Sequence, residues 1–469
     1  MASLMQPRVL GPGDPPPTAQ DAAYAYDYRC TARISGLHDL RYVPRAFRLG
    51  RFIDVAAGRA SATAGIRPEH FTGTTLVIGP TTKGKTTSII APWIATSLRN
   101  GWSCIAIDVK GDLVNAVTKA AGGELEGGRA RTVVLDSGSP NVSWRWLSEL
   151  TRDGGVEAAV GALLGRTPPP QMPDPALYHR DVRLLRTLLG SVVGVADMTT
   201  EHLIAALSTQ AGLRAHISAI GYDGGPLVEL LEFDDAADFS RRTEAILAAL
   251  DGVRGAEQRR HDLPRFELAD AFASPTFVCV TSPLGEEPRS TAFASLVVSL
   301  ALKIGFGRFG TSGGPVLLAI DEAARMGGRI NLEEVTSVGA GAGLRTLLAI
   351  QDVAQFASAG LPPSAAGTIV SNADTMLVMG GSSHASARAF AERLGMVDAP
   401  FQDRSIGNQA SFFPTSSTNT RLVQRPALGD REICAPPFTG RVAVVHARQL
   451  APLPFLVDLE RKDLHPTAI

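Results

Sequence analysis

Residues 79–86 read Gly-Pro-Thr-Thr-Lys-Gly-Lys-Thr, which matches the phosphate-loop pattern G-x-x-x-x-G-K-[ST]. The apolar run Thr74–Ile78 comes directly before this loop, and a helical pattern begins at about Thr86. In that arrangement the backbone N–H groups of the loop and the N-terminus of the helix point at the phosphates of a nucleotide. We expect Lys85 to add a positive charge there and the Thr86 hydroxyl to bind Mg²⁺. The remaining nucleotide-binding candidates in the loop are Gly79, Thr82, Lys83, Gly84 and Thr87.

A pair of carboxylates follows a second apolar run. Val316–Ile320 leads directly into Asp321 and Glu322. A strand that is buried on both faces delivers such residues to its carboxyl end, where open α/β sheets bind ligands. We interpret Asp321 as a Mg²⁺ ligand, directly or through water, and Glu322 as the group that polarises an attacking water. Alone, the pair could be two solvated acids, but the phosphate loop in the same chain favours the catalytic interpretation.

Two further sets of polar residues follow predicted strands. Gln351 comes directly after Thr346–Ile350, where its amide could sense the γ-phosphate, orient water or simply cap the strand. Asp108 and Lys110 follow the run Ser103–Ile107, where they could contact nucleotide or a neighbouring subunit, or form a surface turn. The residues by themselves leave these alternatives open.

The elements that would position these groups alternate between short apolar runs and helical patterns. The predicted strands are Thr74–Ile78, Ser103–Ile107, Arg131–Leu135, Thr276–Val280, Val316–Ile320, Thr346–Ile350, Asp374–Met379, Val442–His446 and Phe455–Leu459. The predicted helices among them are Thr86–Arg99, Leu113–Ala121, Ser290–Ile304, Leu332–Gly339 and His384–Leu394. This alternation predicts an α/β fold with a mostly parallel central sheet that is covered on both faces.

Helical spacing dominates the middle of the chain. Its predicted helices are Val156–Leu164, Leu177–Val193, Glu201–Ser218 and Ser240–Val253. We therefore predict three parts: an N-terminal arm and strand-rich lead-in at 1–70, a nucleotide-binding domain at 71–145 and 271–469, and an inserted helical subdomain at 146–270.

The composition restricts the other functional classes. The 469 residues carry a net charge of −1, so no global positive field indicates nucleic-acid binding. The basic stretch Arg254, Arg259, Arg260 and Arg265 could follow phosphates, but such runs are more often solvated faces.

The four cysteines are far apart, which predicts reduced core residues and no zinc site. The chain contains no N-K-x-D element for guanine, which disfavours a GTPase.

The sequence gives no sign of a membrane segment of its own. The N-terminus lacks the pattern of a signal peptide, and no window reaches 18 apolar residues. We therefore expect a cytoplasmic protein that reaches the inner membrane face, if at all, through a partner.

Taken together, the motifs resemble one family. After the phosphate loop come Asp108-Val109-Lys110-Gly111-Asp112-Leu113, the helical insertion, Ile320-Asp321-Glu322 with Gly327, and Ala349-Ile350-Gln351-Asp352. In this order they resemble the type IV secretion coupling proteins of the TraG/TraD kind, within the RecA/FtsK-like motor ATPases. Ser371-Asn372-Ala373-Asp374 and Gln424-Arg425-Pro426 are similar to later landmarks of that family.

The resemblance implies a RecA-like P-loop NTPase with an inserted all-α subdomain, using ATP and Mg²⁺. Such proteins form rings, typically hexamers, and pass DNA or protein substrates to a secretion channel. On that template Lys85 and Thr86 bind phosphate and Mg²⁺, and Asp321 and Glu322 serve hydrolysis. Gln351 then couples the state of the nucleotide to motion.

Two departures from the family pattern matter. Family members usually begin with transmembrane helices, and they usually carry an arginine eleven residues before the glutamine, where this chain has Ala340. Such an arginine stabilises the transition state in the neighbouring subunit, and the nearby Arg345 is the candidate substitute. Two alternatives therefore stay open beside a coupling motor: a nucleotide-binding scaffold with weak hydrolysis, and a cytosolic DNA translocase in plasmid maintenance or defence.

Overall fold

The computed structural model describes residues 38–54, 59–122, 130–136, 139–151, 154–169, 172–222, 225–232, 235–254, 263–281, 289–308, 313–407, 415–436 and 441–459. The predicted N-terminal arm and Cys30 lie outside these residues, as do Arg259 and Arg260 of the basic stretch.

An 11-stranded sheet forms the centre of the described structure, in the order β2-β1-β15-β14-β11-β3-β10-β9-β4-β8-β5. The strands from β11 to β5 pair in parallel, and those from β2 to β14 extend the sheet in antiparallel fashion. The parallel strands are β3 (Thr74–Ile78), β4 (Ser103–Asp108), β5 (Arg131–Leu135), β8 (Thr276–Thr281), β9 (Val316–Ile320), β10 (Leu344–Ile350) and β11 (Thr375–Met379). The antiparallel strands are β1 (Phe47–Asp54), β2 (Arg59–Ile66), β14 (Val442–Ala447) and β15 (Phe455–Asp458). The predicted α/β class is confirmed, and the lead-in strands β1 and β2 join the same sheet.

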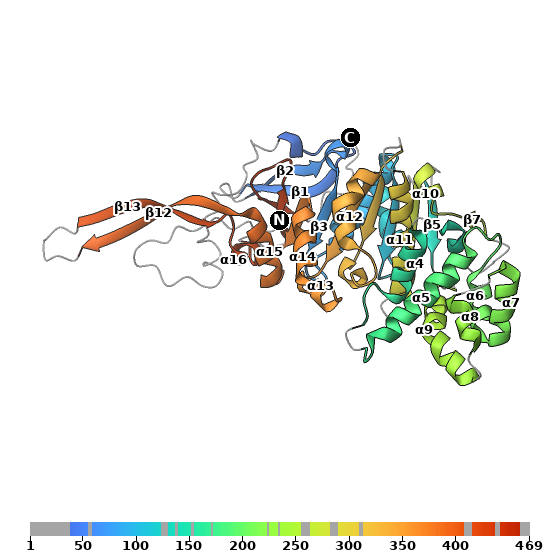
Figure 1. The fold of residues 1–469 in the computed structure, drawn as a ribbon. Coiled ribbons are helices and arrows are strands. Elements are labelled where there is room, and N and C mark those ends of the chain that lie inside the picture. Colours follow the sequence, from blue (N-terminus) through green and yellow to red (C-terminus); the bar gives the residue numbers. More distant parts are fainter. Residues whose placement is uncertain are drawn as a thin grey trace.

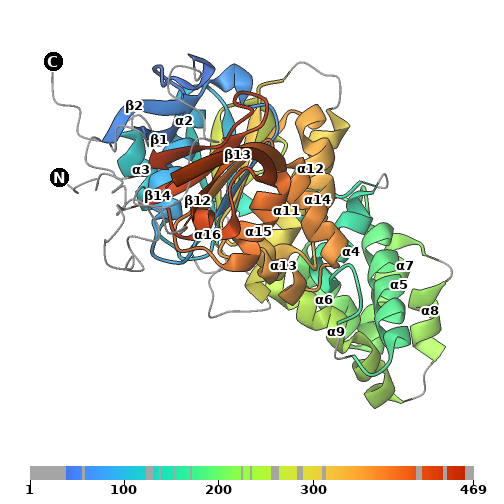
Figure 2. The same cartoon turned by 90° about the vertical axis from the view of Figure 1, so that its left-hand side faces the viewer.

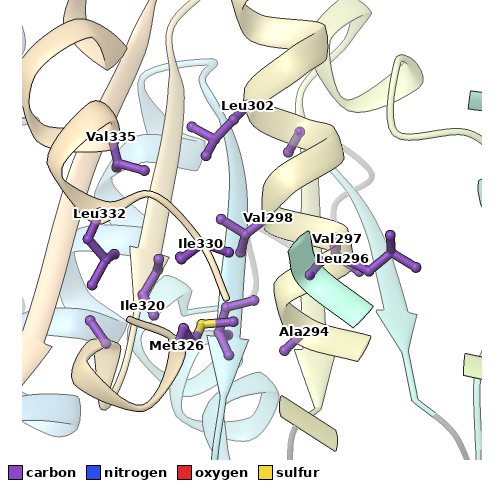
Figure 3. Packing of buried hydrophobic residues seen from close by; sticks show 14 of the residues in the cluster. Ala294, Leu296, Val297, Val298, Leu302, Ile320, Met326, Ile330, Leu332 and Val335 are labelled. Carbon is purple, nitrogen blue, oxygen red and sulfur yellow. The ribbon is translucent and has the colours of Figure 1, made fainter. Parts of the chain in front are cut away.

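Alternate residues of each central strand face opposite sides, and both sides are buried. On β3, Leu76 and Ile78 belong to one hydrophobic cluster and Val77 belongs to the other. Helix α2 (Ala91–Arg99) covers the second cluster with Trp93. Helix α11 (Arg289–Gly307) covers the first cluster, and Figure 3 shows its Val298 and Leu302 on the side of Ile330. Coverage on both faces explains why these strands read as continuous apolar runs.

The remaining helices of the sheet domain connect or flank its strands. They are α3 (Leu113–Ala121), α10 (Asp270–Ala273), α12 (Leu332–Val338), α13 (Ala354–Ser358), α14 (Pro363–Asn372), α15 (His384–Leu394) and α16 (Asp430–Cys434). Single 3-10 turns are η3 (His38–Leu40), η4 (Pro68–His70), η6 (Trp146–Glu149), η7 (Leu230–Glu232), η9 (Ala323–Met326) and η10 (Gly339–Ala342).

The middle of the chain forms a group of helices at one end of the sheet (Figure 1). They are α4 (Gly155–Leu164), α5 (Pro175–Val192), α6 (Thr200–Ser208), α7 (Gln210–Ile220), α8 (Pro226–Glu229) and α9 (Ala236–Arg254). The chain enters this group of helices after β6 (Ser143–Trp144) and leaves it before β7 (Arg265–Phe266). These two short strands pair in parallel. The exact division into domains stays a prediction.

The predicted helix Glu201–Ser218 is wrong in one respect, because it is two helices. Thr209 has an extended backbone, and its side chain accepts a hydrogen bond from Gly212 N, so it caps the start of α7. A β-carbon at position 212 would lie only 2.4 Å from Ala205 O. Glycine at this position therefore permits the close turn between α6 and α7.

A long hairpin was not predicted. Strands β12 (Met396–Gly407) and β13 (Thr415–Pro426) pair with each other in antiparallel fashion along 12 residues each. Figure 1 shows the hairpin extending away from the body on the side opposite the helical group, and Figure 2 views it nearly end-on. Its sequence is polar and lacks the two-residue alternation that identifies a strand packed on a core.

Candidate nucleotide-binding site

The phosphate loop connects β3 to a helix, as predicted. Thr82 and Gly84 adopt positive φ angles of 67° and 84°, which bend the loop between the two elements. The helix begins with a π-helical turn, η5 (Thr86–Ile90), and continues as α2. Gly79 N donates to Ile350 O at 3.1 Å, which fixes the start of the loop to the end of β10. The first amide groups of such a helix have no partner inside it, so this end is suited to an anion.

Lys85 lies inside the loop. Its side chain is only 4% exposed, and Nζ donates to Gly79 O at 2.6 Å. Burial lowers the pKa of this ammonium group, while the nearby Glu322 and Asp321 carboxylates act in the opposite direction. A buried cation with two acids close by is the charge arrangement that the sequence motifs predicted.

The phosphate loop and the carboxylate pair converge. Thr86 Oγ1 donates a hydrogen bond to Asp321 Oδ2 at 3.0 Å, although the two residues are 235 positions apart. Parallel pairing explains this contact, because β3 and β9 flank β10 and all three end at the same edge of the sheet. Asp321 is 4% exposed, and burial raises the pKa of its carboxyl group. Lys110 Nζ lies 4.0 Å from the same oxygen and opposes that shift.

The donor set at this point fits Mg²⁺. A hydroxyl and a buried carboxylate oxygen meet beside a loop suited to phosphate, and Mg²⁺ in nucleotide sites typically takes one or two protein oxygens together with water and phosphate oxygens. Among the described residues, no group of three or more His, Cys, Asp or Glu side chains is gathered as a metal cage. Thr86 and Asp321 therefore suit a metal that arrives with a nucleotide.

Glu322 occupies an unusual backbone conformation. Its φ angle is 55°, which is uncommon for a residue other than glycine, and its side chain is buried. Gln351 Nε2 donates to Glu322 Oε1 at 2.9 Å. Gln355, for which no role was predicted, accepts hydrogen bonds from the backbone amides of Gln351 and Asp352 and so orders the turn after β10. A strained residue held by its neighbours is typical of functional positions.

Asp108 has a structural task in this arrangement. Its carboxylate accepts hydrogen bonds from the backbone N–H groups of Lys110, Gly111 and Leu113. Burial raises the pKa of Asp108, and these three bonds oppose that effect. The carboxylate thus shapes the turn that brings Lys110 to Asp321, while direct contact of Asp108 with nucleotide stays a prediction.

The remaining predicted residues lie in different places. Thr87 Oγ1 donates to Gly84 O at 3.4 Å inside the loop. Lys83 lies beside the turn after β11, because a β-carbon at Gly381 would lie 3.5 Å from Lys83 Cε. Arg345 lies at the opposite end of β10 from Gln351, about 20 Å away along the strand. Its Nη1 donates to Ala340 O at 3.2 Å, so the role of Arg345 in a neighbouring subunit stays a prediction.

The basic stretch at the end of the helical group is at least partly paired. Arg254 Nη2 lies 3.0 Å from Asp251 Oδ1. This ion pair favours the interpretation of a solvated face.

A second cation near the loop was missed by the sequence analysis. A β-carbon at position 84 would lie 2.8 Å from Arg441 Nη1, so the guanidinium lies against the loop backbone. The only sequence signal is a basic residue just before the run Val442–His446. That signal does not tell which edge of the sheet the arginine reaches.

Comparison with known proteins identifies a family for one part of the chain. Residues 315–437, which contain β9, β10 and the long hairpin, match the family described as the TraM recognition site of TraD and TraG. The chain carries a TraG/TraD-type region. The resemblance predicted from the motifs is thereby confirmed.

Solved structures extend the likeness beyond the TraG/TraD-type region. The bacterial conjugative coupling protein TrwBdeltaN70 matches with a TM-score of 0.63 and 16% identity, over 92% of this chain and 90% of that one. The plasmid coupling protein TrwB in complex with ADP and Mg²⁺ matches with a TM-score of 0.58 and 16% identity, over 84% and 87%. TrwB with a non-hydrolysable ATP analogue gives 0.58 and 15% over the same shares. The predicted RecA-like fold is confirmed.

No curated protein sequence matches this chain. Within the described residues, no helix combines the length and apolar character needed to cross a membrane.

Proposed function

We propose that this protein is an ATP-hydrolysing coupling motor of a type IV secretion or conjugative DNA transfer system. The observation that carries the proposal is the hydrogen bond between Thr86 and Asp321, which joins the phosphate loop and the carboxylate pair in one site. The solved TrwB coupling proteins with nucleotide and Mg²⁺ support the choice of ligand.

Each site residue has a task in this proposal. Lys85 and the loop amides bind the β- and γ-phosphates, and Thr86 and Asp321 hold Mg²⁺. The metal would neutralise charge that develops on the phosphates. Glu322, held by Gln351, accepts a proton from the attacking water. Lys110 opposes the rise that burial causes in the pKa of Asp321 and so favours the ionised carboxylate.

The assembly and its partners also belong to the proposal. We infer a homo-oligomeric ring, a hexamer on the family template, that handles DNA or a secreted protein. The protein would work in the cytoplasm and reach the inner face of the membrane through a channel partner.

Turnover tests the proposal. The purified chain should hydrolyse ATP, DNA should raise the rate, and Glu322→Gln should abolish it while Mg²⁺–ADP still binds. Glu333→Gln, an acid-to-amide change on α12 away from the site, is the matched control and should leave the rate unchanged. If Glu322→Gln hydrolyses ATP at the wild-type rate, the assignment of the base is wrong.

One observation favours a second candidate function, a nucleotide-binding scaffold with weak hydrolysis. Ala340 is exposed on the turn η10, where the family places an arginine, and Arg345 is bonded to the backbone of that same turn. Nucleotide would then hold the ring together without rapid turnover. Tight Mg²⁺–ATP binding with no measurable hydrolysis, with or without DNA, would support the scaffold over the motor.

A further inference from the structure

Arg441 is brought to the phosphate loop by the strand order. Val378 of β11 is level with Ile78 of β3, and Gly380 N donates to Val442 O at 2.8 Å across the β11–β14 pair. The residue just before β14 therefore lies level with the chain that leaves β3. Leu459 N donates to Arg441 O at 2.8 Å, which fixes the arginine backbone from its other side.

The side chain of Arg441 lies against the loop, and no carboxylate of the described residues neutralises it. Its Nη1 occupies the space that a side chain at Gly84 would need. It is only partly exposed, and within the described ranges its guanidinium makes no hydrogen bond or ion pair. A guanidinium that is partly withdrawn from water and unpaired is costly, and phosphate oxygens are among its best partners.

The direction of approach separates Arg441 from the hydrolytic groups. In the sheet order β14-β11-β3-β10-β9, the arginine comes from β14 on one side of the loop, and Asp321 and Glu322 come from β9 on the other. Any phosphate oxygen that Arg441 reaches would therefore lie on the side away from Asp321 and Glu322, which would hold the metal and activate the water.

We propose that Arg441 binds the phosphate chain of the nucleotide held in its own subunit, on the side away from the metal, and that it supports affinity and not turnover. This inference rests on the proposed nucleotide-binding function. Arg441 would also supply a positive charge at a site where this chain has Ala340 in place of the arginine that is usual in the family. The attacking water would approach the terminal phosphate, so a contact on the other side would not involve that phosphate, and ADP and ATP should benefit equally.

Calorimetric titration of the full chain with Mg²⁺–ADP and with a Mg²⁺-bound non-hydrolysable ATP analogue tests the proposal. Arg441→Ala should weaken binding of both ligands by about 10-fold or more, the usual cost of losing a charge-assisted hydrogen bond. Arg441→Lys should weaken it less. Arg448→Ala, at the other end of β14 and paired with Asp374, is the control and should bind like the wild type.

The outcomes separate this inference from the proposed function. If Lys85→Ala abolishes binding while Arg441→Ala binds normally, the Arg441 inference is wrong and the nucleotide site stands. If Arg441→Ala weakens only the ATP analogue, its placement away from the terminal phosphate is wrong. If Lys85→Ala also binds normally, the proposed function itself fails. Circular dichroism checks folding, and Arg441→Gln replaces the alanine variant if the latter does not fold.

Discussion

Gln351 Nε2 donates a hydrogen bond to Glu322 Oε1 across 2.9 Å, from the end of β10 to the end of its neighbour β9. The bond holds a buried carboxylate on a backbone with a positive φ angle. It leaves the second carboxylate oxygen available to a water molecule. The orientation of Glu322 is thus determined by a residue from the next strand.

Removing this amide should slow hydrolysis without affecting binding. In Gln351→Ala the Glu322 carboxylate loses its orienting donor, so we expect kcat to fall by about 10- to 100-fold, within the usual contribution of general-base catalysis. The affinity for Mg²⁺–ADP should stay within about 2-fold of the wild type, because binding depends on other groups. Gln449→Ala, at the opposite edge of the sheet, is the control. A fall in affinity with unchanged kcat would contradict this role.

Introducing an arginine at position 340 tests whether its absence limits turnover. Ala340 is exposed on η10, so a long side chain is tolerated there. We expect Ala340→Arg to raise kcat by about 10-fold or more, because an arginine donated between subunits stabilises the transition state. The gain should appear only at concentrations at which the ring assembles. An unchanged rate in the assembled ring would mean that Ala340 does not limit turnover.

Arg329 links the loop after the carboxylate pair to the helical group. Its Nη1 donates to Ala162 O at 2.8 Å and to Leu163 O at 2.6 Å, two of the carbonyl groups in the last turn of α4. A cation at a helix C-terminus is favourable, and its loss leaves those carbonyls without their partner. Arg329→Ala should lower the free energy of unfolding by about 1.5–3 kcal/mol, read from denaturant unfolding. Arg388→Ala, on an exposed face of α15, should change it little.

Glu149 predicts a pH dependence of stability. Its Oε1 accepts hydrogen bonds from Trp144 Nε1 and Leu268 N, and burial raises its pKa from 4.5 to about 7. The folded state therefore binds this proton more tightly than the unfolded state does. The stabilising contribution is complete below about pH 4.5 and is lost as the pH rises through about 7.

Glu149→Gln isolates that contribution. The amide oxygen can keep both hydrogen bonds, and an amide does not titrate. Relative to the wild type, the variant should gain stability between pH 4.5 and 7, by at most about 3 kcal/mol. Denaturant unfolding at several pH values measures the difference. Identical pH profiles for the two proteins would rule Glu149 out as the source.

The sequence predicted the elements that carry the site, and physical reasons explain what it did not predict. Strands β3, β9 and β10 are buried on both faces, so their apolar runs were recognisable, and parallel pairing then brought Asp321 to Thr86. The hairpin β12–β13 forms a sheet of its own, and its sequence lacks the two-residue alternation that identifies a strand packed on a core. Arg441 reaches the site only because β14 runs antiparallel beside β11, and no local pattern reveals such an order.

A double-mutant cycle on Thr86 and Asp321 tests the central claim most directly. The affinity for ADP, with and without Mg²⁺, would be measured for the wild type, Thr86→Ala, Asp321→Asn and the double variant. If both side chains serve one metal-bound nucleotide, each single change should remove most of the Mg²⁺-dependent affinity. The double change should then cost at least about 1 kcal/mol less than the sum. Additive losses, or unchanged Mg²⁺-dependent affinity in both single variants, would contradict a shared site.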